Sequence, residues 1–222
     1  MSALDRMRDL VCEWDEVGDG RAVFLDCYAH MTEAVETALE RNRFADGDWV
    51  GRLLERFADY YFDSIDGGER AAPVPQPWVL AHAAAVGNDA TVPQLLLAGV
   101  NAHINYDLVL TLVDLLGPDW ARTSRDERAV RRADYDLVNC IISETADRVQ
   151  DDVLERRVPL LDTVDHLLGR WDERVTTRLL AGWRSRVWRQ SVDLLDRPPD
   201  LRGGRLAAIE HQCARRARWI LI

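Results

Sequence analysis

The sequence predicts an all-α protein, a single-domain helical bundle of about eight or nine helices around a buried central helix at about 92–117. Three observations predict this class. Apolar residues recur at helical spacing in almost every segment, and runs of alternating β-branched residues typical of strands do not occur. Residues 92–117 are apolar nearly throughout, as expected of a helix in the middle of a bundle.

The chain has 222 residues, of which 47% are hydrophobic, enough for one sizeable core. The clearest loop is the segment AAPVPQP at about 71–77, where three prolines at alternate positions disfavour helix. We interpret it as an internal connection, because the helices before it are too few to form a core alone. The prediction is one all-α domain over 1–222.

Turn and capping residues divide the chain into its helices. Asp48 is the expected N-cap of the third helix, and Ser124 with Glu127 is typical of a capping box. Pro93 fits the first turn of the central helix. The predicted helices cover 3–14, 21–41, 48–65, 78–86, 92–117, 125–155, 160–168, 173–195 and 205–222.

Charge excludes several classes of partner. The net charge is −10, and an acidic surface does not neutralise nucleic-acid phosphates. A membrane span at 92–117 is not expected, because four polar side chains interrupt its middle.

The N-terminus has no apolar signal segment, and the four widely spaced cysteines are typical of small buried side chains, so a cytoplasmic protein is expected.

The central helix carries a polar group in its middle, formed by Asn101, His103, Asn105 and Asp107. With 100° per residue, Asn105 lies within about 40° of Asn101, whereas His103 and Asp107 lie at about 200° and 240°. The helix has no charged face, which predicts burial on all sides. The two pairs should therefore face different neighbouring helices.

Buried polar groups must have partners, since an unpaired one costs roughly 1–3 kcal/mol. His103 and Asp107 are four residues apart and can meet on one helix face. A carboxylate that holds an imidazole raises its basicity and fixes its tautomer, which suits a general base or a metal ligand. The same pair also suits a purely structural hydrogen-bond network, and spacing alone does not decide between them.

The segment LLLAGVNAHINYDL resembles the signature of a bacterial and archaeal family known as domain of unknown function 5995. Further matching segments are RFADYYFDSID, DYDLVN, VQDDV and RSRVW, and the similarity extends over most of the chain. The resemblance implies an all-α fold and no established reaction. It also implies a set of polar or aromatic site residues, namely Tyr60, Asp63, Asn101, His103, Asn105, Asp107, Asn139, Asp152, Arg186 and Trp188.

Our first hypothesis is a small-molecule enzyme with a site inside the bundle. His103 would be the general acid/base, oriented by Asp107. Hydrogen bonds and binding of a polar or anionic group would come from Tyr60, Asp63, Asn101, Asn105, Asn139, Asp152 and Arg186.

Two alternatives remain. In one, the polar group is structural in a non-catalytic bundle that binds an apolar ligand or forms a homo-oligomer. In the other, Asn139, Ser143 and Asp147 at four-residue spacing, with Asp59 and Asp63, resemble the magnesium motifs of class I terpene synthases. Histidines are too scattered for a zinc site, so no metal ligands are predicted, and the identity of any cofactor is left open.

Overall fold

The computed structural model describes residues 2–66, 73–87, 90–157 and 173–222, and within 146–157 and 173–180 it describes the backbone alone. In these ranges the chain is helical and contains no strand, which confirms the predicted all-α class. Counted with the central segments as one continuous rod, there are eight helices in the described chain. The helix predicted at 160–168 lies outside the described residues.

The first three helices are α1 (Ala3–Val17), α2 (Arg21–Glu40) and α3 (Gly47–Asp66). Helix α1 begins with a capping box, in which Ser2 and Asp5 bond each other's backbone N–H. The N-cap of α3 lies two residues before the predicted Asp48. Asp46 accepts the backbone N–H of Trp49 at 3.0 Å. The reason is that α3 already begins at Gly47, which places Asp46 directly before the first helical residue.

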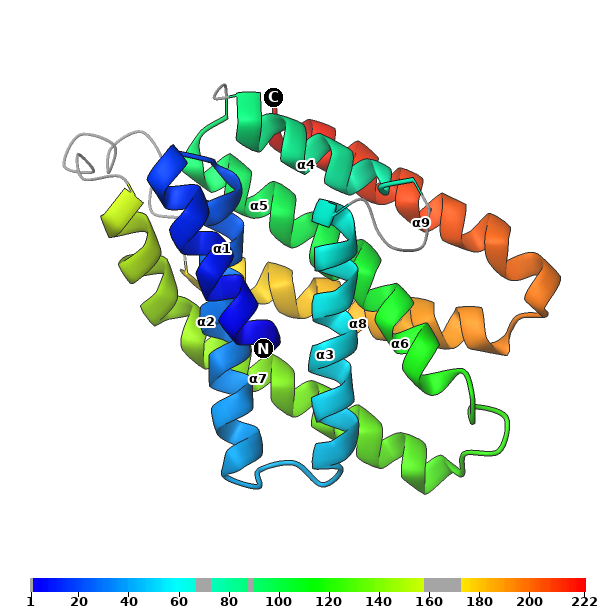
Figure 1. Cartoon of the computed structure of the whole chain (residues 1–222). Coiled ribbons are helices and arrows are strands. Elements are labelled where there is room, and N and C mark those ends of the chain that lie inside the picture. Colours follow the sequence, from blue (N-terminus) through cyan, green and yellow to red (C-terminus); the bar gives the residue numbers. More distant parts are fainter. Residues whose placement is uncertain (1, 67–72, 88–89, 158–172) are drawn as a thin grey trace.

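The central rod consists of α5 (Val92–Ala102), a π-helical turn η1 (His103–Asp107) and α6 (Leu108–Leu116). It crosses the molecule between the other helices (Figure 1). Helix α5 packs against α2, and α6 packs against α3. By length and composition the rod is apolar enough to cross a membrane, but 67% of its most apolar window is buried inside the protein. Burial of this extent is also what the core helix of a bundle shows.

The remaining helices are α4 (Gln76–Gly87), α7 (Arg125–Arg157), α8 (Glu173–Asp196) and α9 (Pro199–Ile220). Helices α4 and α9 lie side by side and both contact α5, while α8 packs on α6 (Figure 1). Helix α9 begins at 199 rather than at the predicted 205, because a proline is well accommodated in a first helical turn. The core that these helices share extends from Leu4 to Ile209.

Small residues let the rod approach its neighbours. A Cβ atom added at Gly99 would lie 2.5 Å from Cγ of Phe24, so the phenyl ring of α2 packs directly on the backbone of α5. Ala98 and Ala102 beside it are fully buried. These small residues therefore allow α2 to approach the rod closely.

The cysteines differ from expectation. Cys213 is buried, but Cys12 and Cys140 are exposed, and none of the four is in a disulfide. The prediction of four buried cysteines was wrong because Cys12 and Cys140 lie on helices that have one solvent face, where helical position decides burial.

Candidate functional site

The polar residues of the rod coincide with its π-helical turn. The N–H of Leu108 bonds the carbonyl oxygen of His103, five residues earlier, instead of the usual four. Turns of this kind occur inside α-helices mostly as single widened turns, and often at functional sites. The extra residue here occurs within the segment that carries His103, Asn105 and Asp107.

His103 and Asp107 form a pair, and an indole joins it. Nδ1 of His103 lies 3.0 Å from Oδ2 of Asp107, and Nε1–H of Trp78 from α4 donates to the same oxygen at 2.8 Å. Thr111 donates its hydroxyl to the carbonyl oxygen of Asp107 at 2.8 Å. The side chains of His103 and Asp107 are 3% and 2% exposed, so the pair is enclosed by protein.

The tautomer of His103 depends on the charge of Asp107. When Asp107 is ionised, Oδ2 accepts from Trp78, and Nδ1–H of His103 is the second donor. Nε2 of His103 is then the unprotonated nitrogen. It is buried and has no hydrogen-bond partner. The imidazole therefore presents one free lone pair inside the core.

Five aromatic side chains surround the imidazole ring of His103, and we call them the aromatic shell. The closest is Phe57, whose ring stacks on the imidazole at 3.5 Å and 10°. Tyr28 follows at 4.3 Å between centroids. The aromatic shell consists of Phe24, Tyr28, Phe57, Tyr61 and Trp78, drawn from α2, α3 and α4.

The aromatic shell contains two further unpartnered groups, the buried hydroxyls of Tyr28 and Tyr61. Burial raises the pKa of the Tyr28 phenol, and the nearby hydroxyl of Thr32 opposes this rise, yet the two hydroxyls do not meet in hydrogen-bond geometry. Leaving a buried polar group unpaired costs about 1–3 kcal/mol. The two hydroxyls and Nε2 of His103 together are therefore a large local cost. Native cores rarely contain such a cluster without a reason.

Burial favours the uncharged form of each ionisable group in the site. It lowers the pKa of His103 well below its usual value, and the charge of Arg184 lowers it further. Burial raises the pKa of Asp107 well above its usual value, against the effect of the Trp78 hydrogen bond and with that of the nearby charge of Asp63. The imidazole is therefore neutral, and the same burial disfavours its protonation.

The opposite side of the rod faces α9. Nδ2 of Asn101 donates to the carbonyl oxygen of Cys213 at 3.0 Å, and its Oδ1 accepts from Asn105 at 3.3 Å and from Arg216 at 3.0 Å. The thiol of Cys213 in turn donates to the backbone oxygen of Asn101. The two polar pairs of the rod thus face different helices, as the helical wheel predicts.

Arg184 of α8 is a buried cation whose charge acts on His103. It is 4% exposed, and its Nε donates to Oδ1 of Asn139 on α7. Tyr135 donates its hydroxyl to the carbonyl oxygen of Arg184 at 2.9 Å, and the guanidinium carbon lies 5.3 Å from the Tyr135 ring centroid. Helix α8 also packs directly against η1.

Several residues expected at the site lie elsewhere. Tyr60 donates to Asp114 at 2.8 Å in a partly exposed cluster with Arg56, away from the aromatic shell. Arg186 is exposed. Asp63 is partly buried, and its charge reaches Asp107. The side chain of Asp152 lies outside the described residues.

Two of the other expected residues take part in α7–α8 packing. Trp188 is buried against Tyr135, with ring centroids 5.1 Å apart, and Asn139 holds Arg184. Sequence reasoning missed Tyr61 and Arg184, although each lies within two residues of a selected one. The usable signal was the apolar face of each helix, because the buried tyrosine and arginine are on that face.

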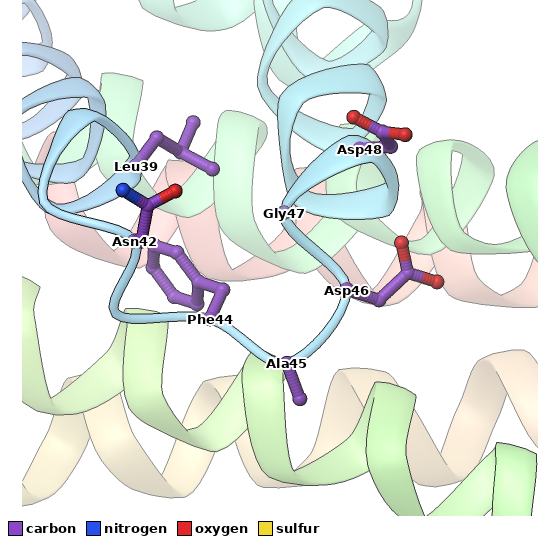
Figure 2. Close-up of a pocket in the computed structure, with 7 residues that line it drawn as sticks. All are labelled: Leu39, Asn42, Phe44, Ala45, Asp46, Gly47 and Asp48. Carbon is purple, nitrogen blue, oxygen red and sulfur yellow. The ribbon is translucent and has the colours of Figure 1, made fainter.

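A surface hollow of about 360 Å³ lies at the turn between α2 and α3, lined by residues from Leu39 to Asp48 (Figure 2). The turn is held by Asp134 of α7, whose carboxylate accepts the backbone N–H groups of Ala45 at 2.9 Å and Asp46 at 2.7 Å. His103 does not line this hollow. The described side chains contain no group of three or more metal-ligating residues.

The fold and the site together define an all-α protein whose central helix carries a buried histidine–aspartate pair inside an aromatic shell. A family model matches residues 1–222, and the chain belongs to this family of unknown function (DUF5995). No curated protein and no solved structure gives a match.

Proposed function

We propose that this protein is a small-molecule enzyme in which His103 acts as a general acid/base and Asp107 orients it. The observation that carries the proposal is the difference in environment between the two imidazole nitrogens. Nδ1 is held by Asp107, while Nε2 is buried without a partner. A neutral imidazole with one nitrogen fixed and the other free is the arrangement that general-base catalysis uses.

The proposed step is a proton transfer. Nε2 of His103 accepts a proton from an X–H group of the substrate, and the electron pair of that bond remains on the substrate atom X. The resulting imidazolium donates from Nδ1–H to Oδ2 of Asp107, which stabilises it when that carboxyl group is ionised. Returning the proton to the product restores the neutral imidazole. The unpartnered hydroxyls of Tyr28 and Tyr61 are suited to hydrogen-bond the same substrate.

A specific observation favours a second function, a non-catalytic bundle in which the pair is structural. His103 is 3% exposed and Phe57 lies flat on its ring, so a substrate reaches Nε2 only when the aromatic shell opens. On this second view a buried water satisfies Nε2 and the two hydroxyls, and the network fixes the packing of the rod.

The test is nitrogen-15 NMR of histidine-labelled protein, because the two imidazole nitrogens give separate signals. A panel of small neutral polar compounds, carboxylates and phosphates is added at millimolar concentration. We expect at least one class of compound to shift the His103 Nε2 signal, which is identified by its absence from the spectrum of His103→Gln. If the whole panel leaves that signal unmoved, the enzyme proposal is wrong and the structural function stands.

A further inference from the structure

Among the residues whose side chains are described, no carboxylate forms an ion pair with Arg184, although the charge of Asp136, which pairs with Arg132, also acts on it. Arg184 is 4% exposed, and its guanidinium bonds the neutral amide of Asn139. Other arginines of the chain differ. Arg6, Arg21, Arg56, Arg131 and Arg197 each hold a carboxylate within 4 Å.

A buried arginine stays charged and requires compensation. A guanidinium group keeps its proton inside proteins, so it does not neutralise itself by losing one. A desolvated charge without a partner is among the most costly groups that a core can contain. The stacking contact with Tyr135 offsets this cost only in part. An arginine in this position is typical of a site completed by an anion.

The position of Arg184 connects it to the aromatic shell. Its charge acts on His103 and on the phenol of Tyr28, and the helix that carries it packs against η1. Nε2 of His103 and the hydroxyl of Tyr28 have no hydrogen-bond partner. A buried positive charge and unsatisfied polar atoms are thus found on neighbouring helices around one imidazole.

We propose that the molecule bound at His103 is a small oxyanion, a carboxylate or a phosphate, whose negative charge is held by Arg184. This inference rests on the proposed binding role of His103 and adds the chemical class of its ligand. Arg184 presents a planar fork of N–H donors that matches an oxyanion, and Asn139 fixes one edge of that fork. The unpartnered groups of His103 and Tyr28 hold the remainder of the ligand.

The experiment measures thermal unfolding with acetate, succinate or inorganic phosphate, each against chloride at equal ionic strength. The binding anion raises the melting temperature by about 5–10 °C at a hundredfold excess over its Kd. Arg184→Leu abolishes that rise. Arg189→Leu, which removes an exposed arginine from the same helix, retains it. The comparison of acetate and succinate with phosphate identifies which oxyanion binds.

A second readout does not need the ligand. Removing an uncompensated buried charge leaves the ligand-free protein at least as stable, so Arg184→Leu keeps or raises the melting temperature without added anion. A loss of 5 °C or more, on the order of what a broken buried ion pair produces, shows that a carboxylate of the protein already pairs with Arg184 and overturns the inference.

The two proposals fail differently. If neutral compounds shift the His103 Nε2 signal as strongly as anions do, in wild type and in Arg184→Leu alike, the binding role of His103 stands and the anion inference is wrong. If anions stabilise the protein without shifting the His103 signal, the anion lies elsewhere and the anion inference is wrong. The binding role of His103 is then wrong only if the neutral compounds also leave its signal unmoved.

Discussion

The imidazole of His103 lies flat on the ring of Phe57, with centroids 3.5 Å apart and planes inclined by 10°. This contact makes Phe57 the side chain that most directly covers the histidine. Phe57 comes from α3, whereas His103 belongs to the central rod, so the stack also joins two helices. Access to His103 therefore depends on how α3 and its phenylalanine pack.

Phe57→Leu should make His103 accessible. A smaller, non-planar side chain leaves a gap over the imidazole and lowers the free energy of unfolding by about 1–3 kcal/mol. The measurement is the rate at which diethyl pyrocarbonate modifies His103, read by mass spectrometry. Phe62→Leu, at an equally buried position of the same helix, should cost similar stability without exposing His103. Equal modification rates in the two variants would contradict the covering role of Phe57.

Trp78→Phe should destabilise the protein through Asp107. The indole N–H is a donor to Oδ2, and its loss leaves a buried carboxyl group with one partner fewer, at a cost of about 1–3 kcal/mol beyond the change in volume. Trp49→Phe is a matched control, because Trp49 is 1% exposed and its Nε1 has no partner. Urea unfolding of both variants gives the difference. An equal loss of unfolding free energy in the Trp49 and Trp78 variants would contradict the role of the indole hydrogen bond.

Gly99→Ala should weaken the contact between α2 and the rod. Its added methyl group would lie 2.5 Å from Phe24 Cγ, so one of the helices must move, at a cost of about 1–3 kcal/mol. Gly203→Ala provides the opposite case, because nothing lies within 4 Å of a Cβ atom there. It should raise the free energy of unfolding by about 0.5–1 kcal/mol, since alanine favours helix. Differential scanning calorimetry of both variants measures whether the two changes in stability have opposite signs.

Asp134→Asn should loosen the turn between α2 and α3. The carboxylate accepts two backbone N–H groups, and an amide replaces one acceptor with a donor that faces Ala45 or Asp46. The expected loss is about 1–3 kcal/mol, with faster amide hydrogen exchange at 45 and 46. Asp136→Asn, which removes a half-exposed partner of Arg132, should change stability by less than about 0.5 kcal/mol. Unchanged exchange at the turn would disprove the role of Asp134.

His82 should make stability fall as the pH falls. Burial lowers the pKa of its imidazole to about 4. The folded protein thus binds fewer protons than the unfolded chain between pH 6.5 and 4, and acidification through this window favours unfolding. Neutral His82 donates from Nε2 to Ser64 Oγ at 3.1 Å, because that hydroxyl already donates to Tyr61.

The expected loss between pH 6.5 and 4 is about 2–3 kcal/mol from His82, and His103 acts in the same direction. Asp107 acts in the opposite direction, because its raised pKa stabilises the protonated folded form at low pH and loses that effect as the pH rises. Urea titrations at both pH values measure the sum, and His82→Gln should reduce the slope. An NMR titration that places His82 near 6.5 would contradict the prediction.

The sequence was sufficient for the fold and for the direction of each polar pair. Apolar periodicity predicts helices directly, and most predicted bounds fall within three residues of those observed. The opposite placement of Asn101 and His103 follows from their spacing alone. The π-helical turn was not predictable, because a widened turn of five residues leaves no distinct pattern in the apolar spacing.

The composition of the site was harder to predict than its location. Tyr60 and Tyr61 are adjacent, and sequence similarity selected the one that bonds Asp114 instead of the one in the aromatic shell. Arg186 and Arg184 differ by two positions, which on a helix is about 200° and separates solvent from core. Neighbours in sequence share a motif but not a face, so only packing distinguishes them.

The hydrogen bond from Asn101 to the carbonyl oxygen of Cys213 joins residues 112 positions apart. During synthesis at about 5–20 residues per second, Cys213 is therefore added to the chain roughly 6–20 s after Asn101. Until then the apolar rod that surrounds it lacks the helix that covers one side. A nascent chain of this protein therefore leaves one side of its most hydrophobic segment uncovered until α9 has been synthesised.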